Sequence, residues 1–160
     1  MTFDGSFGVE TYLDNDTINL ILGLNKSRRV KRDTKALARK LDISVKECLE
    51  TYLEDGQLYV PDCDDFTDDE SVVSLNEPPS DQPGLFCKWT VDVEDNSIVW
   101  DGTQDFENFF EWLNYLIEIV LKPRGYVVNG KVRYVGKRLD DMGLITVKKN
   151  DVLLKRFVGY

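Results

Sequence analysis

The stretch "PDCDDFTDDESVVSLNEPPSDQ", residues 61–82, constrains the fold of this chain most, because it holds eight Asp or Glu and no Lys or Arg. It also has three prolines and few large apolar side chains, so it cannot bury enough surface to offset the entropy lost on ordering. We therefore interpret it as an acidic linker between two folded units, 12–60 and 83–160. An ordered acidic loop lying over one of these units is the alternative.

The linker also accounts for most of the net charge of −9. Residues 1–60 carry a net charge of −1, residues 61–82 one of −8, and residues 83–160 one of 0. Basic residues concentrate in residues 26–46, where nine Lys or Arg face two Asp, a local balance of +7. Such a cluster attracts phosphate groups. A further hypothesis is that the acidic linker folds back onto this basic segment and competes with phosphate.

Residues 34–60, "TKALARKLDISVKECLETYLEDGQLYV", predict a helix, a tight turn, a second helix and a short strand "QLYV". Ser44 and Glu47 have the S-x-x-E spacing of a capping box at the start of the second helix. Asp55-Gly56 is expected to end that helix, because glycine adopts left-handed backbone angles. An earlier helix is expected to start after Asp14 or Asp16 and to end near residue 25.

Residues 34–53 resemble the helix-turn-helix superfamily, and "DGQLYV" is similar to the start of a winged-helix wing. Asp42 stands where the family usually has glycine in the turn, and aspartate tolerates the left-handed region better than most residues. The resemblance covers about a third of the chain and implies a winged-helix-like unit over residues 14–60. It is carried by small Ala38 between the helices, by Leu37, Leu41 and Ile43, and by Cys48 in the second helix.

The resemblance and the basic cluster together predict a non-enzymatic, DNA-binding protein. The second helix, however, exposes Lys46 beside Glu47, Glu50 and Glu54, and several carboxylates near the DNA backbone repel it. The alternative is a protein–protein interaction or structural protein in which the helix pair does not bind nucleic acid. The candidate nucleic-acid contacts are Lys26, Arg28, Arg29, Lys31, Arg32, Lys35, Arg39, Lys40, Ser44 and Lys46.

Residues 83–160 predict a small α+β domain of order ββαββββ, with one long helix packed on an antiparallel sheet. Two strands, "LFCKWTVDV" and "SIVW", form a hairpin before a helix that starts near Asp101 or Thr103. Asn129-Gly130 and Asn150-Asp151 are read as two-residue hairpin turns, and the last strand is "VLLKRFV". The apolar face of the helix comprises Phe106, Phe109, Phe110, Leu113, Leu116, Ile117 and Val120.

The C-terminal half also resembles a family of uncharacterised small proteins from large DNA viruses, phages and bacteria. The shared features are a W-L-x-Y-L-I helix, an L-K-P-x-G-Y exit, an N-G hairpin and a D-D-x-G-x-I-x-V strand entry. The resemblance covers about half the chain, is compatible with a viral or a bacterial protein, and implies no activity.

The sequence shows few residues that could form a catalytic site or a metal site. The chain has no histidine and no C-x-x-C, so we expect no metal, no cofactor and no Ser/His or Cys/His nucleophile. The stretch "GYVVNGKV" differs from a phosphate-binding loop by Val132 in place of Ser or Thr, and we interpret it as a hairpin. Two of the acidic side chains of Glu107, Glu111, Glu118, Asp140 and Asp141 could in principle share acid and base roles, but we interpret them as a solvated surface.

The α+β domain is expected to bind a protein partner or to form a homo-oligomer, and Trp112 and Tyr115 are candidates for the partner patch. No apolar run approaches the length of a membrane span, and the first residues lack the pattern of a signal peptide. We therefore expect no membrane partner and an intracellular location: the cytoplasm, or the host cell or virion if the protein is viral.

Overall fold

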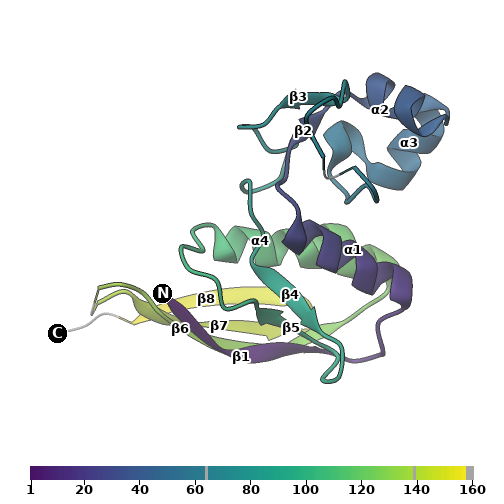
Figure 1. Ribbon diagram of the computed structural model, residues 1–160. Helices are drawn as coiled ribbons and strands as arrows, with labels where there is room; N and C mark the ends of the chain where they lie inside the picture. The colour runs from purple at the N-terminus through teal and green to yellow at the C-terminus, as the bar shows by residue number, and fades with distance from the viewer. Residues whose placement is uncertain (64, 139, 158–160) are drawn as a thin grey trace. The chain divides into compact units, whose positions relative to one another are not determined.

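The computed structural model describes residues 1–63, 65–138 and 140–157, which form an α+β protein (Figure 1). The chain divides into two compact units. Unit 1 comprises Met1–Asn19 and Lys88–Tyr160, and unit 2 comprises Leu20–Cys87. The predicted α+β class is therefore confirmed, but the division of the chain differs from the predicted one.

Unit 1 is built on a six-stranded sheet of order β4-β5-β1-β6-β7-β8, in which every neighbouring pair is antiparallel. Along β7 and the second half of β6, buried side chains alternate with more exposed ones, as expected for a sheet covered on one face. The strands are β1 (Thr2–Val9), β4 (Trp89–Asp92), β5 (Ser97–Trp100), β6 (Val128–Val135), β7 (Met142–Lys148) and β8 (Asp151–Phe157).

Strand β1, which the sequence reading did not assign, lies in the middle of this sheet between β5 and β6. It pairs with β6 along its whole length, from Thr2 opposite Val135 to Val9 opposite Val128. The predicted hairpin of β4 and β5 is present, with Trp89 opposite Trp100.

The predicted turn at Asn129-Gly130 is wrong, because both residues lie inside strand β6. A side chain at position 130 would overlap the backbone oxygen of Ser6 in β1. Glycine is therefore required here for close strand approach, and the order after residue 83 is ββαβββ instead of ββαββββ.

The last hairpin was predicted one residue too late. Lys148 pairs with Asp151, so Lys149 and Asn150 form the turn, and both have positive φ angles of 45° and 71°. Such angles are typical of a type I′ turn. Residue 158 of the predicted last strand lies outside the described residues.

Helix α4 (Phe109–Tyr115) begins later than predicted and continues as a π-helical turn, η2 (Leu116–Leu121), and a 3-10 turn, η3 (Lys122–Arg124). The Asp101 carboxylate accepts the backbone N–H of Thr103 at 2.8 Å, which makes a local turn instead of a helix cap. The expected apolar face is confirmed: Phe106, Phe109, Leu113, Leu116, Ile117 and Val120 are buried and Phe110 is half-buried.

Helix α1 (Asn15–Lys26) contains the boundary between the two units. Its predicted cap is confirmed, since the Asp14 carboxylate accepts the backbone N–H of Thr17 at 2.7 Å. Tyr126 donates its hydroxyl to the same carboxylate at 3.0 Å.

Unit 2 contains the predicted pair of helices, α2 (Thr34–Leu41) and α3 (Val45–Tyr52). Asp42 between them adopts the left-handed conformation, with φ 56° and ψ 46°. The Ser44 hydroxyl accepts the backbone N–H of Glu47 at 3.0 Å and thereby caps α3. The shared core comprises Leu37, Ala38, Cys48, Val60 and Cys63, with Leu41, Ile43 and Tyr52 packed against it.

The predicted strand "QLYV" is wrong, because α3 is followed by a 3-10 turn, η1 (Glu54–Gly56), and residues 57–60 form no strand. Leu58 and Val60 instead bury their side chains. The small sheet of unit 2 pairs β2 (Lys31–Arg32) with β3 (Val72–Ser74).

The acidic segment 61–82, predicted as a linker, lies inside unit 2. It contributes β3 to the small sheet, and within it Cys63, Asp69 and Ser71 are buried. The composition of the segment is that of a linker, but specific pairing with the basic segment, described next, holds it in place.

Candidate functional site

Arg29, one of the predicted nucleic-acid contacts, is buried in unit 2. Its guanidinium donates hydrogen bonds to the Ser27 hydroxyl at 2.9 Å, to the Gly56 and Gln57 carbonyls at 3.0 Å each, and to the Gln82 side-chain oxygen at 3.2 Å. These bonds tie the chain after α1 to η1 and to the end of the acidic segment. Arg29 therefore holds the unit together and does not face solvent.

Arg32 is also buried, and it pairs with Asp69 of the acidic segment at 2.7 Å. The same guanidinium donates to the Ser71 hydroxyl at 2.7 Å and to the Cys63 carbonyl at 2.8 Å. Lys40, on α2, reaches the same Asp69 carboxylate at 2.8 Å. The contact that the fold-back hypothesis requires is thus present at Asp69.

The Asp69 carboxyl group has a pKa well below its usual value. Burial raises the pKa, but hydrogen bonds from Lys40, Ser71 and Arg32 outweigh this effect. The carboxylate is therefore ionised wherever the protein is folded at ordinary pH, and it neutralises part of the basic segment permanently.

Arg28 is half-buried, and its guanidinium is hydrogen-bonded to the acidic segment. Its Nε donates to the Leu75 carbonyl at 2.6 Å and its Nη2 to the Asn76 side-chain oxygen at 3.3 Å. The guanidinium also lies over the ring of Phe86, 5.3 Å from the ring centre. A phosphate contact by Arg28 would compete with these partners.

The remaining predicted contacts lie on the surface of unit 2. Ser44 is exposed, but its hydroxyl already caps α3. The other side chains form no ion pair with any residue that the structure describes. They are Lys26, Lys35, Arg39 and Lys46, which are exposed, and Lys31, which is half-buried.

The charge around these cations is unfavourable for phosphate. Unit 2 has nine Lys or Arg against fourteen Asp or Glu, a net charge of −5. On α3 itself, Lys46 is exposed next to Glu47 and Glu50. Because the acidic residues belong to the same unit, their repulsion acts directly on any polyanion that approaches.

A groove of about 420 Å³ lies on unit 2, and we call it the unit 2 groove. Three apolar side chains on it are unusually exposed: Val45 (40%) and Leu49 (41%) of α3, and Val73 (59%) of β3. The sequence reading missed this site because Val73 fell in the supposed linker. The remaining lining residues are Lys31, Arg32, Asp33, Thr34, Lys35, Glu54 and Asp55.

Some charged side chains that line this groove already have a partner within the protein, and others do not. Asp55 accepts hydrogen bonds from the hydroxyl and the backbone N–H of Ser80. Lys31 and Lys35 form no ion pair with any described residue. The unit 2 groove therefore offers an apolar surface next to two cations, and the exposed carboxylate of Glu54 also lines it.

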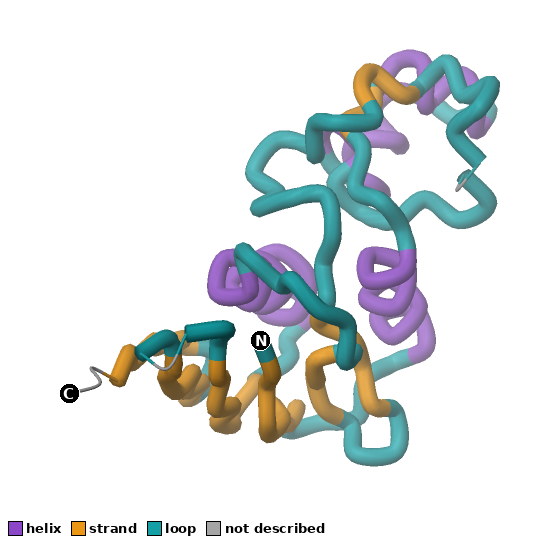
Figure 2. Tube along the Cα trace, turned by 60° about the vertical axis from the view of Figure 1, so that its left-hand side comes forward, coloured by secondary structure: helices purple, strands orange, loops and turns teal. Residues whose placement is uncertain are grey.

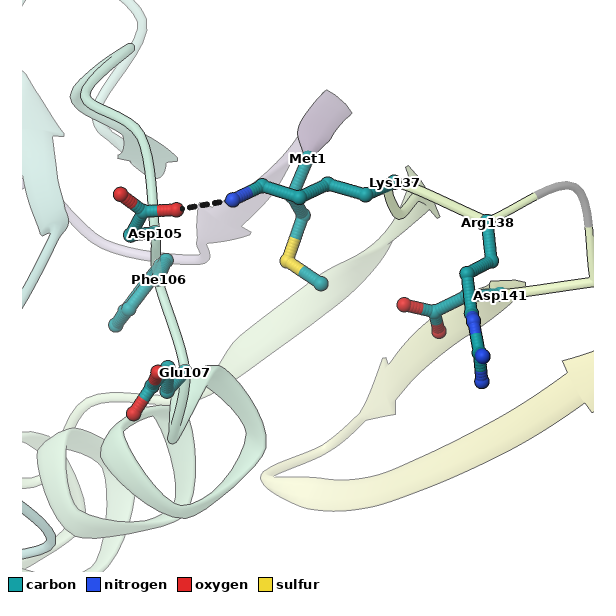
Figure 3. A pocket seen from close by; sticks show the side chains of 7 residues that line it. All are labelled: Met1, Asp105, Phe106, Glu107, Lys137, Arg138 and Asp141. Carbon is teal, nitrogen blue, oxygen red and sulfur yellow. Dashed lines mark hydrogen bonds and ion pairs between the residues drawn. The ribbon is translucent and has the colours of Figure 1, made fainter.

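A second hollow, also of about 420 Å³, lies in unit 1 between the segment before α4 and the loop after β6 (Figure 3). Lys137 pairs with Asp105 at 2.9 Å, and both side chains are largely exposed. Their hydrogen bond lowers the pKa of Asp105 and raises the pKa of Lys137. The lining residues are Met1, Asp105, Phe106, Glu107, Lys137, Arg138 and Asp141.

This hollow contains two of the acidic residues considered in the sequence, Glu107 and Asp141. Figure 3 shows their carboxylates on opposite sides of the hollow. Glu111 is exposed on α4, and Glu118 pairs with Lys122 at 3.4 Å. The structure therefore does not bring these carboxylates together as an acid–base pair.

Trp112 and Tyr115, predicted as a partner patch, are buried, with 1% and 5% of their surfaces exposed. Their rings pack edge to face, with centres 5.5 Å apart. The prediction of an exposed patch is wrong because both residues lie on the packed side of α4.

In the described part of the chain, no helix is both long enough and apolar enough to cross a membrane. No group of three or more Cys, Asp or Glu side chains in those residues is arranged to hold a metal ion. Cys48, Cys63 and Cys87 are buried, and none of them forms a disulfide bond within the described residues.

Comparisons with known proteins find no match for this chain, whether with protein-family models, with curated proteins or with solved structures. The two resemblances described from the sequence therefore stay predictions.

Proposed function

We propose that this chain is a non-enzymatic binding protein in which unit 2 recognises a segment of a partner protein. The observation that carries the proposal is the exposure of Val45, Leu49 and Val73 around one groove. Exposed apolar side chains that gather at a hollow mark binding surfaces more often than scattered ones do. The helix pair then serves as a docking surface, in keeping with the resemblance to the helix-turn-helix superfamily, which we propose for the fold of unit 2.

The partner segment carries one acidic residue beside an apolar side chain; Glu54, which also lines the groove, disfavours further acidic residues. Lys31 and Lys35 are available for a carboxylate, while Asp55 already accepts hydrogen bonds from Ser80. Complementary charges steer and orient a partner more than they add affinity. An apolar side chain of the partner, packed on Leu49 and Val73, would supply most of the binding free energy.

Nucleic-acid binding has weaker support than protein binding. Arg29 and Arg32 are committed to internal contacts, and Lys40 shares the Asp69 carboxylate. Unit 2 as a whole is negatively charged, with a net charge of −5. Binding to phosphates would depend on the exposed Lys and Arg side chains alone.

The test is a selection from a phage-displayed library of random peptides against the whole protein, followed by titration of the enriched peptides by fluorescence anisotropy. We expect peptides that carry an acidic residue next to an apolar one. Completing the burial of Leu49, which is 41% exposed, contributes about 1 kcal/mol, or about fivefold in Kd. The variant Leu49→Asn removes the apolar contact and places a polar side chain in the groove without attracting the acidic residue of the peptide, so we expect it to weaken binding by about tenfold.

Lys46→Glu is the matched control, because Lys46 lies on α3 but does not line the groove. It should leave peptide binding unchanged. Enrichment of peptides whose binding Leu49→Asn does not affect would refute the groove as the binding site.

The nucleic-acid alternative is tested with a short random DNA duplex at about 50 and about 200 mM salt. DNA binding that falls steeply with salt, is weakened by Lys46→Glu and is unchanged by Leu49→Asn would favour phosphate contacts over the protein-binding proposal. We expect no such binding at the higher salt concentration.

A further inference from the structure

Strand β8 (Asp151–Phe157) forms one edge of the unit 1 sheet. It pairs with β7 on one side, and no other strand in the described part of the chain pairs with its outer side. Edge strands present backbone N–H and C=O groups that pair readily with another strand. Proteins usually protect such edges against unwanted pairing with charged side chains. The side chains of β8 therefore determine which second strand can pair with it.

The two faces of β8 are defined by its register with β7. Thr146 lies opposite Leu153, and Leu144 lies opposite Lys155, while Ile145 between them is buried. Leu153 and Lys155 therefore belong to the face opposite the buried one. Figures 1 and 2 show α4 on one face of the sheet, and no described helix of unit 1 lies on the other.

Leu153 stands out on this open face, because 67% of its surface is exposed in the middle of an edge strand. It is flanked two residues away on either side by opposite charges, Asp151 and Lys155, both exposed. Side chains two residues apart point to the same face of a strand. If a second copy of this strand runs antiparallel beside the first, the acid of each strand lies opposite the base of the other, and the two leucines lie opposite each other.

We propose that β8 pairs with β8 of a second copy of this chain, antiparallel and with Leu153 on the two-fold axis. In this register Leu153 contacts its own equivalent, and Asp151 lies opposite Lys155 of the second copy. By symmetry the same charge pair forms twice. Val152 and Leu154 lie opposite each other on the other face, so every position from 151 to 155 has a compatible partner.

Neighbouring registers lack this complementarity. With Leu154 on the axis, Lys155 lies opposite Leu153 and Asp151 opposite Phe157. With Lys155 on the axis, two lysines face each other, and like charges placed directly opposite are destabilising. The charged residues of β8 thus exclude the alternatives while permitting one register.

The test is analytical ultracentrifugation of the whole protein over a range of micromolar concentrations. We expect a reversible change from the 18.4 kDa chain to a dimer of twice that mass. Asp151→Lys and Lys155→Glu should each be monomeric, because each variant places like charges opposite each other. The double variant with both changes should regain the dimer, and an equimolar mixture of the two single variants should form a mixed dimer.

Glu94→Lys is the control, because it makes the same charge change at an exposed position of the β4–β5 turn. It should associate as the unchanged protein does. Asp151→Lys places a lysine across from Lys148 in β7, so circular dichroism must show that the variant is folded.

If that variant does not fold, Leu153→Lys replaces it, since this exposed position tolerates a polar side chain and two lysines would meet on the axis. An unchanged protein that stays monomeric at every concentration overturns the proposal. Charge variants that dimerise as before, or single variants that are monomeric but do not recombine on mixing, overturn it as well.

Discussion

Asp69 is the residue whose loss we expect to harm unit 2 most. Its carboxylate is buried and binds Arg32 at 2.7 Å, Lys40 at 2.8 Å and the Ser71 hydroxyl at 2.6 Å. Asp69→Asn keeps the size of the side chain but removes the negative charge, so the Arg32 guanidinium stays buried without a counter-ion. Breaking one partner of a buried ion pair costs about 3–5 kcal/mol.

The lower end of that range applies here, because the Lys40 side chain is 37% exposed and can turn towards water. We therefore expect Asp69→Asn to lower the free energy of unfolding by about 3 kcal/mol. With a urea dependence of about 1–3 kcal/mol per molar, the unfolding midpoint falls by roughly 1–3 M. Deleting residues 62–81 is a poorer test of the fold-back hypothesis, since it would also remove the buried Cys63 and Ser71.

Urea unfolding followed by far-ultraviolet circular dichroism is the appropriate assay, because all three tryptophans lie in unit 1 and report poorly on unit 2. Asp68→Asn is the matched control: it removes the same charge from the neighbouring exposed position. Equal midpoints for the Asp68 and Asp69 variants would show that the buried ion pairs do not stabilise the fold.

The pH dependence gives an independent check. The pKa of Asp69 is lower in the folded protein than in the unfolded chain, so the folded protein binds fewer protons in acid and its stability rises with pH there. The stability that the carboxylate contributes is complete above the unfolded pKa of about 4 and is lost progressively below it. The difference between the native protein and Asp69→Asn should be constant near neutral pH and should narrow on acidification.

Three further substitutions test other features of the structure. Gly23→Ala should destabilise unit 2 by about 1–3 kcal/mol in thermal unfolding, although alanine normally favours a helix, because the new methyl group overlaps the Tyr59 ring; a stabilised variant would contradict this packing. Gly130→Ala should weaken the β1–β6 pairing, since its methyl group meets the Ser6 backbone, and faster amide hydrogen exchange in both strands is the expected signature. Lys137→Met breaks an exposed ion pair and should leave the melting temperature unchanged; a large decrease would mean that the pair is structural.

Features decided by near neighbours in the sequence were predictable. The Ser44 cap of α3 and the Asp14 cap of α1 both depend on a side chain and a backbone group three residues apart. The left-handed turn at Asp42 is equally local. In such cases the residue type and its spacing are enough to predict the structure, because the interaction that decides it is local.

Features decided by distant segments were not predictable in the same way. Asn129-Gly130 is a strong local turn signal, but β1, more than a hundred residues earlier, lies against Gly130 and makes it part of a strand. Strand β1 itself was missed because its partner β6 is far away in the sequence. The burial of Arg29 was hidden for the same reason, since its carbonyl partners at Gly56 and Gln57 come from another part of unit 2.

The fold changes the interpretation of the separate acidic and basic segments of the sequence, because the two segments contact each other within unit 2. A basic segment of +7 and an acidic segment of −8 lie in one unit, and the ion pairs between them meet at the buried Asp69 carboxylate. Opposite charges used in this way hold two segments together and leave little positive potential for attracting polyanions over a distance. The apolar groove formed by Val45, Leu49 and Val73 lies outside this charge pairing. That is why we propose a protein partner, and not a phosphate backbone, for unit 2.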